Sequence, residues 1–189
     1  ALRHLFFAKN AAEKNSYKSL AKPVKNVGVL GAGLMGSGIA QVSTQAGYNV
    51  LLKDQTLEFA AKGKGNIYKD VSKRVGKGMS DFERDEIVGR VTPVVDYEKF
   101  HAANLTFEAV LETLELKQQV LRDVEAVAPE GHVFATNTSS IPIGQIAANA
   151  EHPEAVLGMH YFSPVPKMPL LEIIKTDQTA DWALATAIE

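Results

Sequence analysis

The sequence predicts an α/β fold in which helices cover both faces of a doubly wound, mostly parallel sheet. From Val24 onward, short β-branched runs alternate with longer helical patterns, which is typical of such a sheet. Several of these runs are apolar throughout, as strands buried on both faces require. Hydrophobic residues make up 46% and charged residues 22% of the 189 positions, so the composition is that of a folded chain.

The chain before the first strand is expected to lie outside the sheet. Leu2, Leu5 and Phe6 share one face of a helical pattern over residues 1–14, and residues 15–23 form a polar linker that carries lysine. The sequence therefore predicts a short amphipathic helix followed by a linker.

Apolar and β-branched runs bounded by polar or glycine residues predict the strands of the sheet. We expect the last of them to be an antiparallel strand at the edge. The expected strands are Asn26–Leu30, Asn49–Lys53, Val91–Val95, Leu105–Val110, Val133–Thr136, Val156–His160 and Leu170–Ile174.

Residues 54–90, between the second and third strands, are more than one crossover helix needs. They predict an inserted helical hairpin. Its first helix is a long, lysine-rich pattern over Thr56–Lys77, and the second follows Gly78, where Ser80 and Glu83 have the spacing of a capping box.

The last residues, Thr179–Glu189, predict a helix on which Trp182, Leu184 and Ile188 await partners. We therefore expect this helix to begin the connection to a further domain. The expected division of the chain is a linker helix and linker over 1–23, the sheet domain over 24–176 and the start of the connection over 177–189.

A glycine-rich turn follows the first strand. Gly31, Gly33 and Gly36 have the GxGxxG spacing, and the turn opens a helix that ends at Gly47. These glycines permit a tight turn, close approach of a pyrophosphate and close packing of helix on strand. The next strand ends in Asp54, where a carboxylate can bind the ribose hydroxyls of an adenosine. The sequence therefore predicts a Rossmann-type dinucleotide site.

The residue after Asp54 is Gln55, so no arginine stands beside it to accept a 2′-phosphate, and NAD is favoured over NADP. In the alternative interpretation, the glycines only make a strand–helix turn and Asp54 caps the following helix.

Polar side chains follow the buried strand Val133–Thr136, at Asn137, Thr138 and Ser139. In open α/β sheets the carboxyl edge carries the ligand crevice, so Ser139 could bind an oxygen of a substrate beside the nicotinamide. The alternative is that these residues simply form a turn before Pro142 starts a helix.

His160 ends one apolar strand and Glu172 lies inside the next. A buried, unpaired carboxylate is costly, so Glu172 is expected to have a partner, and His160 is the obvious candidate. A carboxylate on one imidazole nitrogen leaves the other nitrogen free to accept a proton. Alternatively, His160 is a structural residue and Glu172 lies on a solvent face.

Glu108 and Glu112 flank the end of the fourth strand, and Lys117 lies on the next helix. Either the three form an exposed ion cluster of little energetic value, or they reach the nicotinamide side of the cofactor.

Four separated segments together resemble the NAD-binding domain of the L-3-hydroxyacyl-CoA dehydrogenases of fatty-acid β-oxidation. They are VGVLGAGLMGSGIAQV with Asp54, FEAVLETLELK, FATNTSSIPI and GMHYFSPVPKMPLLEII. The first residues, ALRHLFFA, resemble the segment that joins the enoyl-CoA hydratase part to the dehydrogenase part in multifunctional fatty-acid oxidation α subunits. The resemblance covers roughly residues 24–175.

By this resemblance, His160 removes the 3-hydroxyl proton while hydride passes to NAD, Glu172 orients His160, and Ser139 holds the substrate oxygen. Ser163 stands where many single-function members have Asn, so its contact with the cofactor is expected to be shorter or water-mediated. Motif and resemblance together imply cofactor contacts at Gly31, Gly33, Leu34, Met35, Gly36, Asp54, Val110, Glu112, Lys117, Ser139 and Ser163.

The lysine-rich helix is expected to carry Lys69, Lys73 and Lys77 on one face, and the resemblance implies that this face binds the CoA of an acyl-CoA substrate. The alternative is that these lysines belong to a solvated helix face. The family's helical second domain, with a further catalytic Asn, is not in this sequence, so the chain alone is expected to bind NAD and to turn over substrate poorly.

The resemblance implies a hydratase domain and a helical dehydrogenase domain in the same full-length chain, and a thiolase subunit as a further partner. Localisation is expected in the bacterial cytoplasm, with the mitochondrial matrix as the alternative. The net charge of −2 favours no nucleic acid, and no apolar run is long enough to span a membrane. Cysteine is absent and the histidines are scattered, so no metal site is expected.

Two rival functions stay open. One is another Rossmann dehydrogenase for small 3-hydroxy acids, which would use a lysine base from a later helix. The other is a non-catalytic, NAD-binding or lens-crystallin-like structural protein, which the same fold could host.

Overall fold

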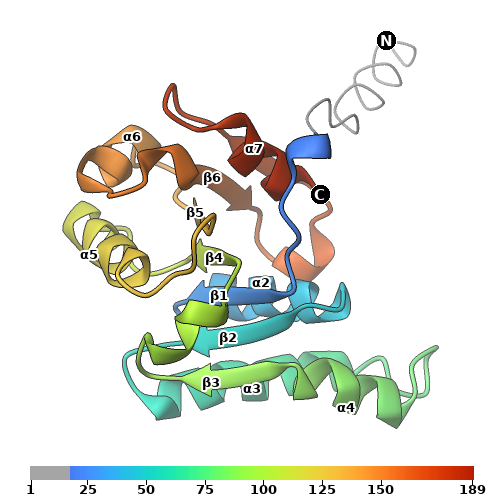
Figure 1. The fold of residues 1–189 in the computed structure, drawn as a ribbon. Helices are drawn as coiled ribbons and strands as arrows, with labels where there is room; N and C mark the ends of the chain where they lie inside the picture. Colours follow the sequence, from blue (N-terminus) through green and yellow to red (C-terminus); the bar gives the residue numbers. More distant parts are fainter. Residues whose placement is uncertain (1–17) are drawn as a thin grey trace.

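A seven-stranded sheet organises residues 18–189, the part of the chain that this computed structural model describes (Figure 1). The strand order is β3-β2-β1-β4-β5-β6-β7. Neighbouring strands from β3 to β6 pair in parallel, and β7 pairs with β6 in the antiparallel sense, as expected for the edge. The strands are β1 (Asn26–Leu30), β2 (Asn49–Lys53), β3 (Val91–Val94), β4 (Leu105–Glu108), β5 (Val133–Thr136), β6 (Val156–Tyr161) and β7 (Leu171–Ile174). The helix predicted over residues 1–14 lies outside the described residues.

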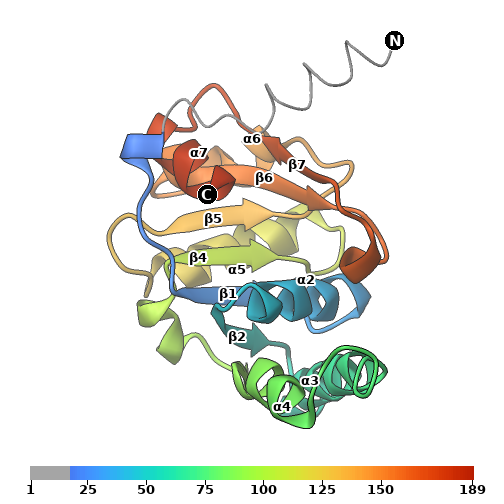
Figure 2. The ribbon, with the colours of Figure 1, turned by 90° about the vertical axis from the view of Figure 1, so that its right-hand side faces the viewer.

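The helices cover both faces of the sheet, which confirms the doubly wound architecture (Figure 2). Side chains of α2, α3 and α7 share one apolar core with alternate residues of the strands, and α5 and α6 share the other. The helices are α2 (Leu34–Gln45), α3 (Leu57–Ser72), α4 (Asp81–Gly89), α5 (Leu114–Glu125), α6 (Ile143–Ile146) and α7 (Asp181–Ile188). Short 3-10 segments are η1 (Lys18–Leu20), η2 (Glu98–Ala102), η3 (Ala147–Asn149), η4 (Pro153–Ala155) and η5 (Val165–Lys167).

Strand ends differ from the prediction by one or two residues. The clearest case is β4, which was expected to continue to Val110 but ends at Glu108. The Val110 amide donates to the carboxylate of Glu108 at 2.9 Å instead of joining a strand ladder. The backbone therefore leaves the sheet at Val110, whose N–H is bonded to the Glu108 side chain and not to a neighbouring strand.

The inserted hairpin is present, although its first helix is shorter than predicted. Thr56 caps α3 by accepting from the Phe59 amide at 3.2 Å, and the helix ends at Ser72 rather than at Lys77. Gly76 and Gly78 then adopt positive φ angles, which a helix does not contain. The capping box of Ser80 and Glu83 begins α4 as predicted.

The last helix, α7, packs on the sheet through small side chains. Ala183, Ala185 and Ala187 are buried, whereas Trp182 and the other large apolar residues of the helix are half-buried. No helix within residues 18–189 combines the length and the apolar character that a bilayer span requires.

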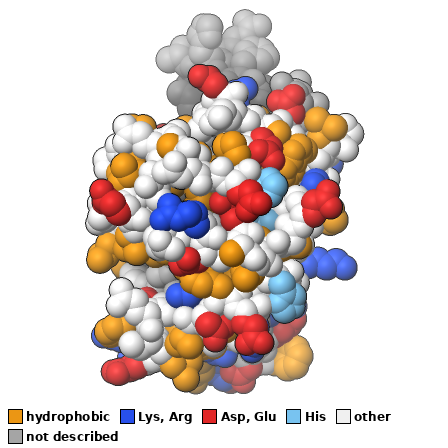
Figure 3. Space-filling view, turned by 60° about the vertical axis from the view of Figure 1, so that its left-hand side comes forward, with side chains coloured by type: hydrophobic (Ala, Val, Ile, Leu, Met, Phe, Trp, Pro, Cys, Tyr) orange, Lys and Arg blue, Asp and Glu red, His pale blue; other side chains and the backbone are white. Residues whose placement is uncertain are grey.

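The face on which α5 and α6 lie is turned forward in Figure 3. Acidic and basic side chains are interspersed on it, as the near balance of charges in the sequence leads one to expect.

Candidate dinucleotide and catalytic site

The glycine turn lies between β1 and α2 and uses its three glycines for different reasons. Gly31 has a φ of +92°, a left-handed conformation that glycine adopts without strain. A Cβ on Gly36 would lie 1.7 Å from the carbonyl oxygen of Gly31, so helix and turn approach too closely for any side chain. Gly33 has an ordinary φ of −69°, and a Cβ there would meet nothing within 4 Å.

Gly33 is therefore required neither by the backbone nor by its neighbours in the protein. A Cβ at this position would project into open space beside the first turn of α2, where backbone N–H groups carry partial positive charge. This is the arrangement expected where a phosphate group approaches the backbone closely, and the turn fits a pyrophosphate.

Asp54, at the end of β2, ties the glycine turn to the neighbouring strand. Its Oδ2 accepts from the Ala32 amide at 2.7 Å, and its Oδ1 accepts from the Gln55 amide at 2.7 Å. The alternative in which Asp54 caps the next helix is wrong, because Thr56 is the cap of α3. The carboxylate is thus held beside the turn, where the ribose of an adenosine would need it.

A cavity of about 520 Å³ opens from the turn. Its lining includes Gly31, Gly33 and Asp54, apolar side chains such as those of Val110 and Leu116, and several polar or charged side chains. Tyr97 also lines the cavity, and the ammonium of Lys53 lies 4.4 Å from its ring centroid. Burial, and then the nearby Asp123, raise the pKa of the Tyr97 hydroxyl above its ordinary value, so it stays a neutral wall at physiological pH.

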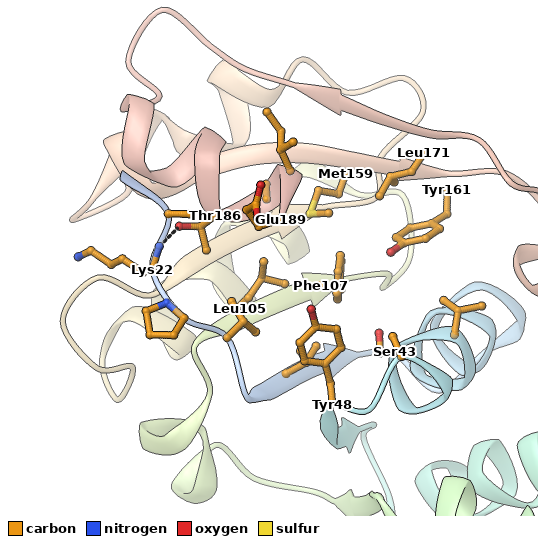
Figure 4. A pocket seen from close by; sticks show the side chains of 18 of the residues that line it. Lys22, Ser43, Tyr48, Leu105, Phe107, Met159, Tyr161, Leu171, Thr186 and Glu189 are labelled. Carbon is orange, nitrogen blue, oxygen red and sulfur yellow. Dashed lines mark hydrogen bonds between the residues drawn. The ribbon is translucent and has the colours of Figure 1, made fainter. Parts of the chain in front are cut away.

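A larger cavity, of about 640 Å³, lies elsewhere, between α2 and α7 (Figure 4). Tyr48, Phe107, Met159 and Tyr161 are among the side chains that face it, and most of its lining is apolar. None of the residues predicted for the site lines this cavity. The glycine turn, and not cavity size, therefore identifies the dinucleotide site.

Two other predicted contacts open α2. Leu34 is 76% exposed at the start of the helix, and Met35 packs against the core. Both follow the glycine turn directly, so they lie at the phosphate end of the site.

Glu108 and Lys117 form a buried ion pair at the carboxyl ends of the central strands. Lys117 Nζ lies 2.7 Å from Glu108 Oε1, and the two side chains are 1% and 0% exposed, respectively. Lys117 Nζ also lies 3.1 Å from Glu112 Oε2, at the surface. The interpretation of these residues as an exposed ion cluster is wrong, since only Glu112 reaches solvent. Strand order explains the burial, because β4 lies between β1 and β5.

Glu112 in turn holds the segment that follows β5. Its Oε1 accepts from the Thr138 hydroxyl, from the Ser139 amide at 3.3 Å and from the Ser140 hydroxyl at 3.2 Å. Although burial raises the pKa of Glu112, the hydrogen bonds from Thr138, Lys117 and Ser140 and the charge of Lys117 lower it to about 2. Glu112 is therefore an anion at any physiological pH.

Asn137 joins three strands at the same edge. The backbone N–H of Asn137 donates to the Glu108 carbonyl oxygen at 2.8 Å, and its side-chain Oδ1 accepts from the backbone N–H of Tyr161 at 2.8 Å. The residues after β5 thus do more than form a turn before α6, which begins after Pro142. Ser139 is exposed in this segment.

The structure brings His160 and Glu172 together. The antiparallel register of β6 and β7 places the two residues directly opposite one another, and His160 Nδ1 lies 2.9 Å from Glu172 Oε2. Phe162 flanks the imidazole, with ring centroids 4.7 Å apart. Among the described residues, no hydrogen bond engages His160 Nε2, so this nitrogen is available to a substrate.

The expectation that Glu172 is a buried carboxylate is wrong. Its side chain is 49% exposed, whereas that of His160 is 20% exposed. Strand register, and not the cost of burying a charge, therefore makes the pair.

The predicted CoA-facing lysines do not share one helix face. Lys69 lies on α3, Lys73 follows its last residue, and Lys77 lies beyond the helix in the turn made by Gly76 and Gly78. Lys73 pairs with Asp70 at 3.0 Å. All three lysines are exposed, as is Ser163 after β6.

The sequence analysis did not single out Ser140, Tyr97, Phe162 or Thr136 of this site, and of these Thr136 is the most deeply buried. Its hydroxyl donates to Glu108 Oε2 at 2.7 Å, which completes the set of donors around that carboxylate. Its place as a hydroxyl residue at the end of an otherwise apolar strand is the only signal that could have found it.

Comparison with known proteins places these features in a family. The model of the family "3-hydroxyacyl-CoA dehydrogenase, NAD binding domain" matches residues 26–189. The fatty acid oxidation complex subunit alpha of Shewanella amazonensis is 43% identical over 192 residues, an alignment that covers 100% of this chain and 27% of that protein. The chain thus spans about a quarter of the length of this relative, and the same holds for the subunit from Shewanella frigidimarina, also 43% identical.

Comparison with solved structures shows the same fold in related proteins. The FadB2 protein of M. tuberculosis has a TM-score of 0.84 and 37% identity, covering 88% of this chain and 59% of its own. The 3-hydroxybutyryl-CoA dehydrogenase of Escherichia coli has a TM-score of 0.84 and 35% identity, covering 88% of this chain and 35% of its own.

Proposed function

Because the chain belongs to the family of 3-hydroxyacyl-CoA dehydrogenase NAD-binding domains, with NAD as its cofactor, we propose that it serves the oxidation of an L-3-hydroxyacyl-CoA to the 3-ketoacyl-CoA. The chain contributes the cofactor site and the acid–base pair. Other segments of the full-length polypeptide contribute the rest of the substrate site, since the relatives are much longer than this chain.

The glycine turn and Asp54 hold the adenosine diphosphate half of the cofactor. The amides of the turn and the N-terminus of α2 bind the pyrophosphate, and Asp54 binds the ribose hydroxyls. A 2′-phosphate would meet the carboxylate of Asp54 with no arginine beside it, so NAD is preferred over NADP. Bound NAD supplies the acceptor for the hydride that leaves C3 of the substrate.

His160 is the proton acceptor in this proposal. Glu172 holds the proton on Nδ1, so Nε2 presents its lone pair and takes the proton of the 3-hydroxyl group. The Ser139 hydroxyl binds the same oxygen and stabilises the charge that develops on it. Glu112, Lys117 and Ser163 contact the nicotinamide half of the cofactor, and Lys69 and Lys73 attract the phosphates of CoA.

One observation supports this function most directly. A His–carboxylate pair at 2.9 Å lies at the carboxyl edge of the same sheet whose β1 carries the glycine turn. A dehydrogenase with a lysine base would not need that pair, and a structural protein would gain little stability from an ion pair whose carboxylate is half exposed.

The experiment replaces His160 by Ala in the full-length polypeptide that contains this chain. Turnover of L-3-hydroxyacyl-CoA, followed by NADH absorbance, is expected to fall by at least about a hundredfold, with NAD affinity unchanged. Retained turnover would favour a lysine-base dehydrogenase. A wild-type protein that binds NAD and oxidises no acyl-CoA of any chain length would favour a non-catalytic role.

The partners follow from the same proposal. A hydratase domain and a helical dehydrogenase domain occupy the same polypeptide, and a thiolase subunit receives the 3-ketoacyl product. The proposed location is the bacterial cytoplasm.

A further inference from the structure

Glu108 is a fully buried carboxylate whose two oxygens accept hydrogen bonds from three donors. Its Oε1 accepts from Lys117 Nζ at 2.7 Å and from the Val110 amide at 2.9 Å, and its Oε2 accepts from the Thr136 hydroxyl at 2.7 Å. Burying an ionised carboxylate costs several kcal/mol in order of magnitude, and a single ion pair often fails to offset that cost. A carboxylate at this position therefore calls for a role that an apolar side chain could not fill.

The bonds of Glu108 extend in two directions to one segment, residues 137–140. Through Lys117 it reaches Glu112, which accepts from Thr138, Ser139 and Ser140. Through Thr136 it reaches the same segment again, because the Thr138 amide donates to the Thr136 hydroxyl at 3.3 Å. Two routes of hydrogen bonds and ion pairs, one through Lys117 and Glu112 and one through Thr136, thus connect the segment to the Glu108 carboxylate.

We propose that Glu108 is a positioning residue that, through Thr136 and Lys117, fixes the segment 137–140 for the nicotinamide half of the cofactor. This inference rests on the proposed function, which places Ser139 and Glu112 beside that half. Glu108 itself touches neither cofactor nor substrate.

The network approaches the adenosine half only at the Val110 amide, which donates to Glu108 and lies beside Gly31. Its bonds through Thr136 and Lys117 lead to the segment 137–140 instead. The adenosine half depends on the glycine turn and on Asp54, whose hydrogen bonds lie between β1 and β2 and include no member of the network. Loosening the segment after β5 is therefore expected to weaken NAD while leaving ADP-ribose, which lacks nicotinamide, unaffected.

The test uses two threonine-to-valine substitutions of equal size in buried strands. Thr136→Val removes the hydroxyl that joins Glu108 to the segment. Thr106→Val removes a hydroxyl two residues before Glu108 on β4, where Thr106 Oγ1 lies 2.9 Å from the buried His132 Nε2 and, among the described residues, has no hydrogen bond to the network. Affinities of the full-length polypeptide that contains this chain for NAD and for ADP-ribose are measured by isothermal titration calorimetry.

Thr136→Val is expected to raise the Kd for NAD by about tenfold, with the Kd for ADP-ribose changed by less than about twofold. Thr106→Val, which costs stability without touching the network, is expected to leave the ratio of the two Kd values unchanged. Thr136→Ser keeps the hydroxyl and is expected to restore the wild-type ratio. Glu108→Gln is expected to produce the same selective loss, and if this variant does not fold, the threonine pair decides alone.

An equal change in both Kd values for Thr136→Val, or no change in either, would overturn the positioning role. Binding of NAD and ADP-ribose by the unsubstituted protein tests the proposed function itself. If the unchanged chain binds neither ADP-ribose nor NAD, the proposed cofactor site is wrong, and this inference falls with it.

Discussion

Two glycines of the same turn are expected to respond to the same substitution in opposite ways. A Cβ on Gly36 would lie 1.7 Å from the Gly31 carbonyl oxygen, and neither atom can rotate away because the backbone fixes the positions of both. A Cβ on Gly33 would meet nothing within 4 Å, and its φ of −69° suits any residue. Gly36→Ala is therefore expected to lower the stability of the fold, whereas Gly33→Ala is expected to weaken the binding of NAD.

The magnitudes follow from the contacts. Overpacking against backbone costs about 3 kcal/mol or more, which lowers the Tm of Gly36→Ala by roughly 6–12 °C in a chain of this size. Gly33→Ala loses only the mild preference for glycine at a helix N-cap, about 1 kcal/mol at most, or roughly 2–4 °C. If the pyrophosphate occupies the open space, the same methyl group raises the Kd for NAD by about ten- to a hundredfold.

Calorimetric unfolding gives the two Tm values, and isothermal titration gives the Kd of Gly33→Ala for NAD. The reasoning would be refuted if Gly33→Ala bound NAD with wild-type affinity, because the open space would then not be the cofactor site. It would also be refuted if Gly33→Ala lowered the Tm as far as Gly36→Ala does.

Three further predictions concern charge. Asp54→Ala removes the acceptor for the Ala32 amide and is expected to raise the Kd for NAD by about ten- to a hundredfold in titration calorimetry. The control Glu58→Ala removes an exposed carboxylate on α3 and is expected to leave this Kd unchanged. Lys117→Met leaves Glu108 buried without a cation and is expected to cost about 3–5 kcal/mol in urea unfolding; a double variant with Glu108→Gln that recovered none of this loss would count against the ion pair. Burial lowers the pKa of His132 from 6.5 to about 4, so the unfolded chain takes up a proton first as pH falls, and stability is fully present above pH 6.5 and declines towards pH 4. The expected loss is about 3 kcal/mol, and His132→Gln should flatten this part of the curve; an unchanged slope would mean that His132 is not the group that titrates.

The sheet could be predicted from the sequence because its strands are short apolar runs that end at special residues. The glycine turn after Leu30 and the box of Ser80 and Glu83 are local signals whose physical effect does not depend on the rest of the fold. The end of α3 could not be predicted as well, because lysine-rich sequence continues past Ser72 and only the positive φ angles of Gly76 and Gly78 show where the helix stops.

The buried network could not be predicted, since charged residues ordinarily lie at the surface. Only the strand order, with β4 between β1 and β5, encloses Glu108 and brings Thr136 to it. For the pair His160 and Glu172 the sequence analysis expected the right partners for the wrong reason. Register across β6 and β7 aligns them, and Glu172 is half exposed rather than buried.

The proposed role of His160 as the base is tested most directly by comparing Glu172→Gln and His160→Gln in the full-length polypeptide. For each variant the rate of NADH formation from L-3-hydroxyacyl-CoA and the Kd for NAD are measured. Loss of the imidazole base should slow hydride transfer by about a hundred- to ten-thousandfold, and loss of its carboxylate partner by less, with both Kd values near that of the wild type. Wild-type rates in the His160 variant would show that the proton leaves by another route and would contradict the assignment.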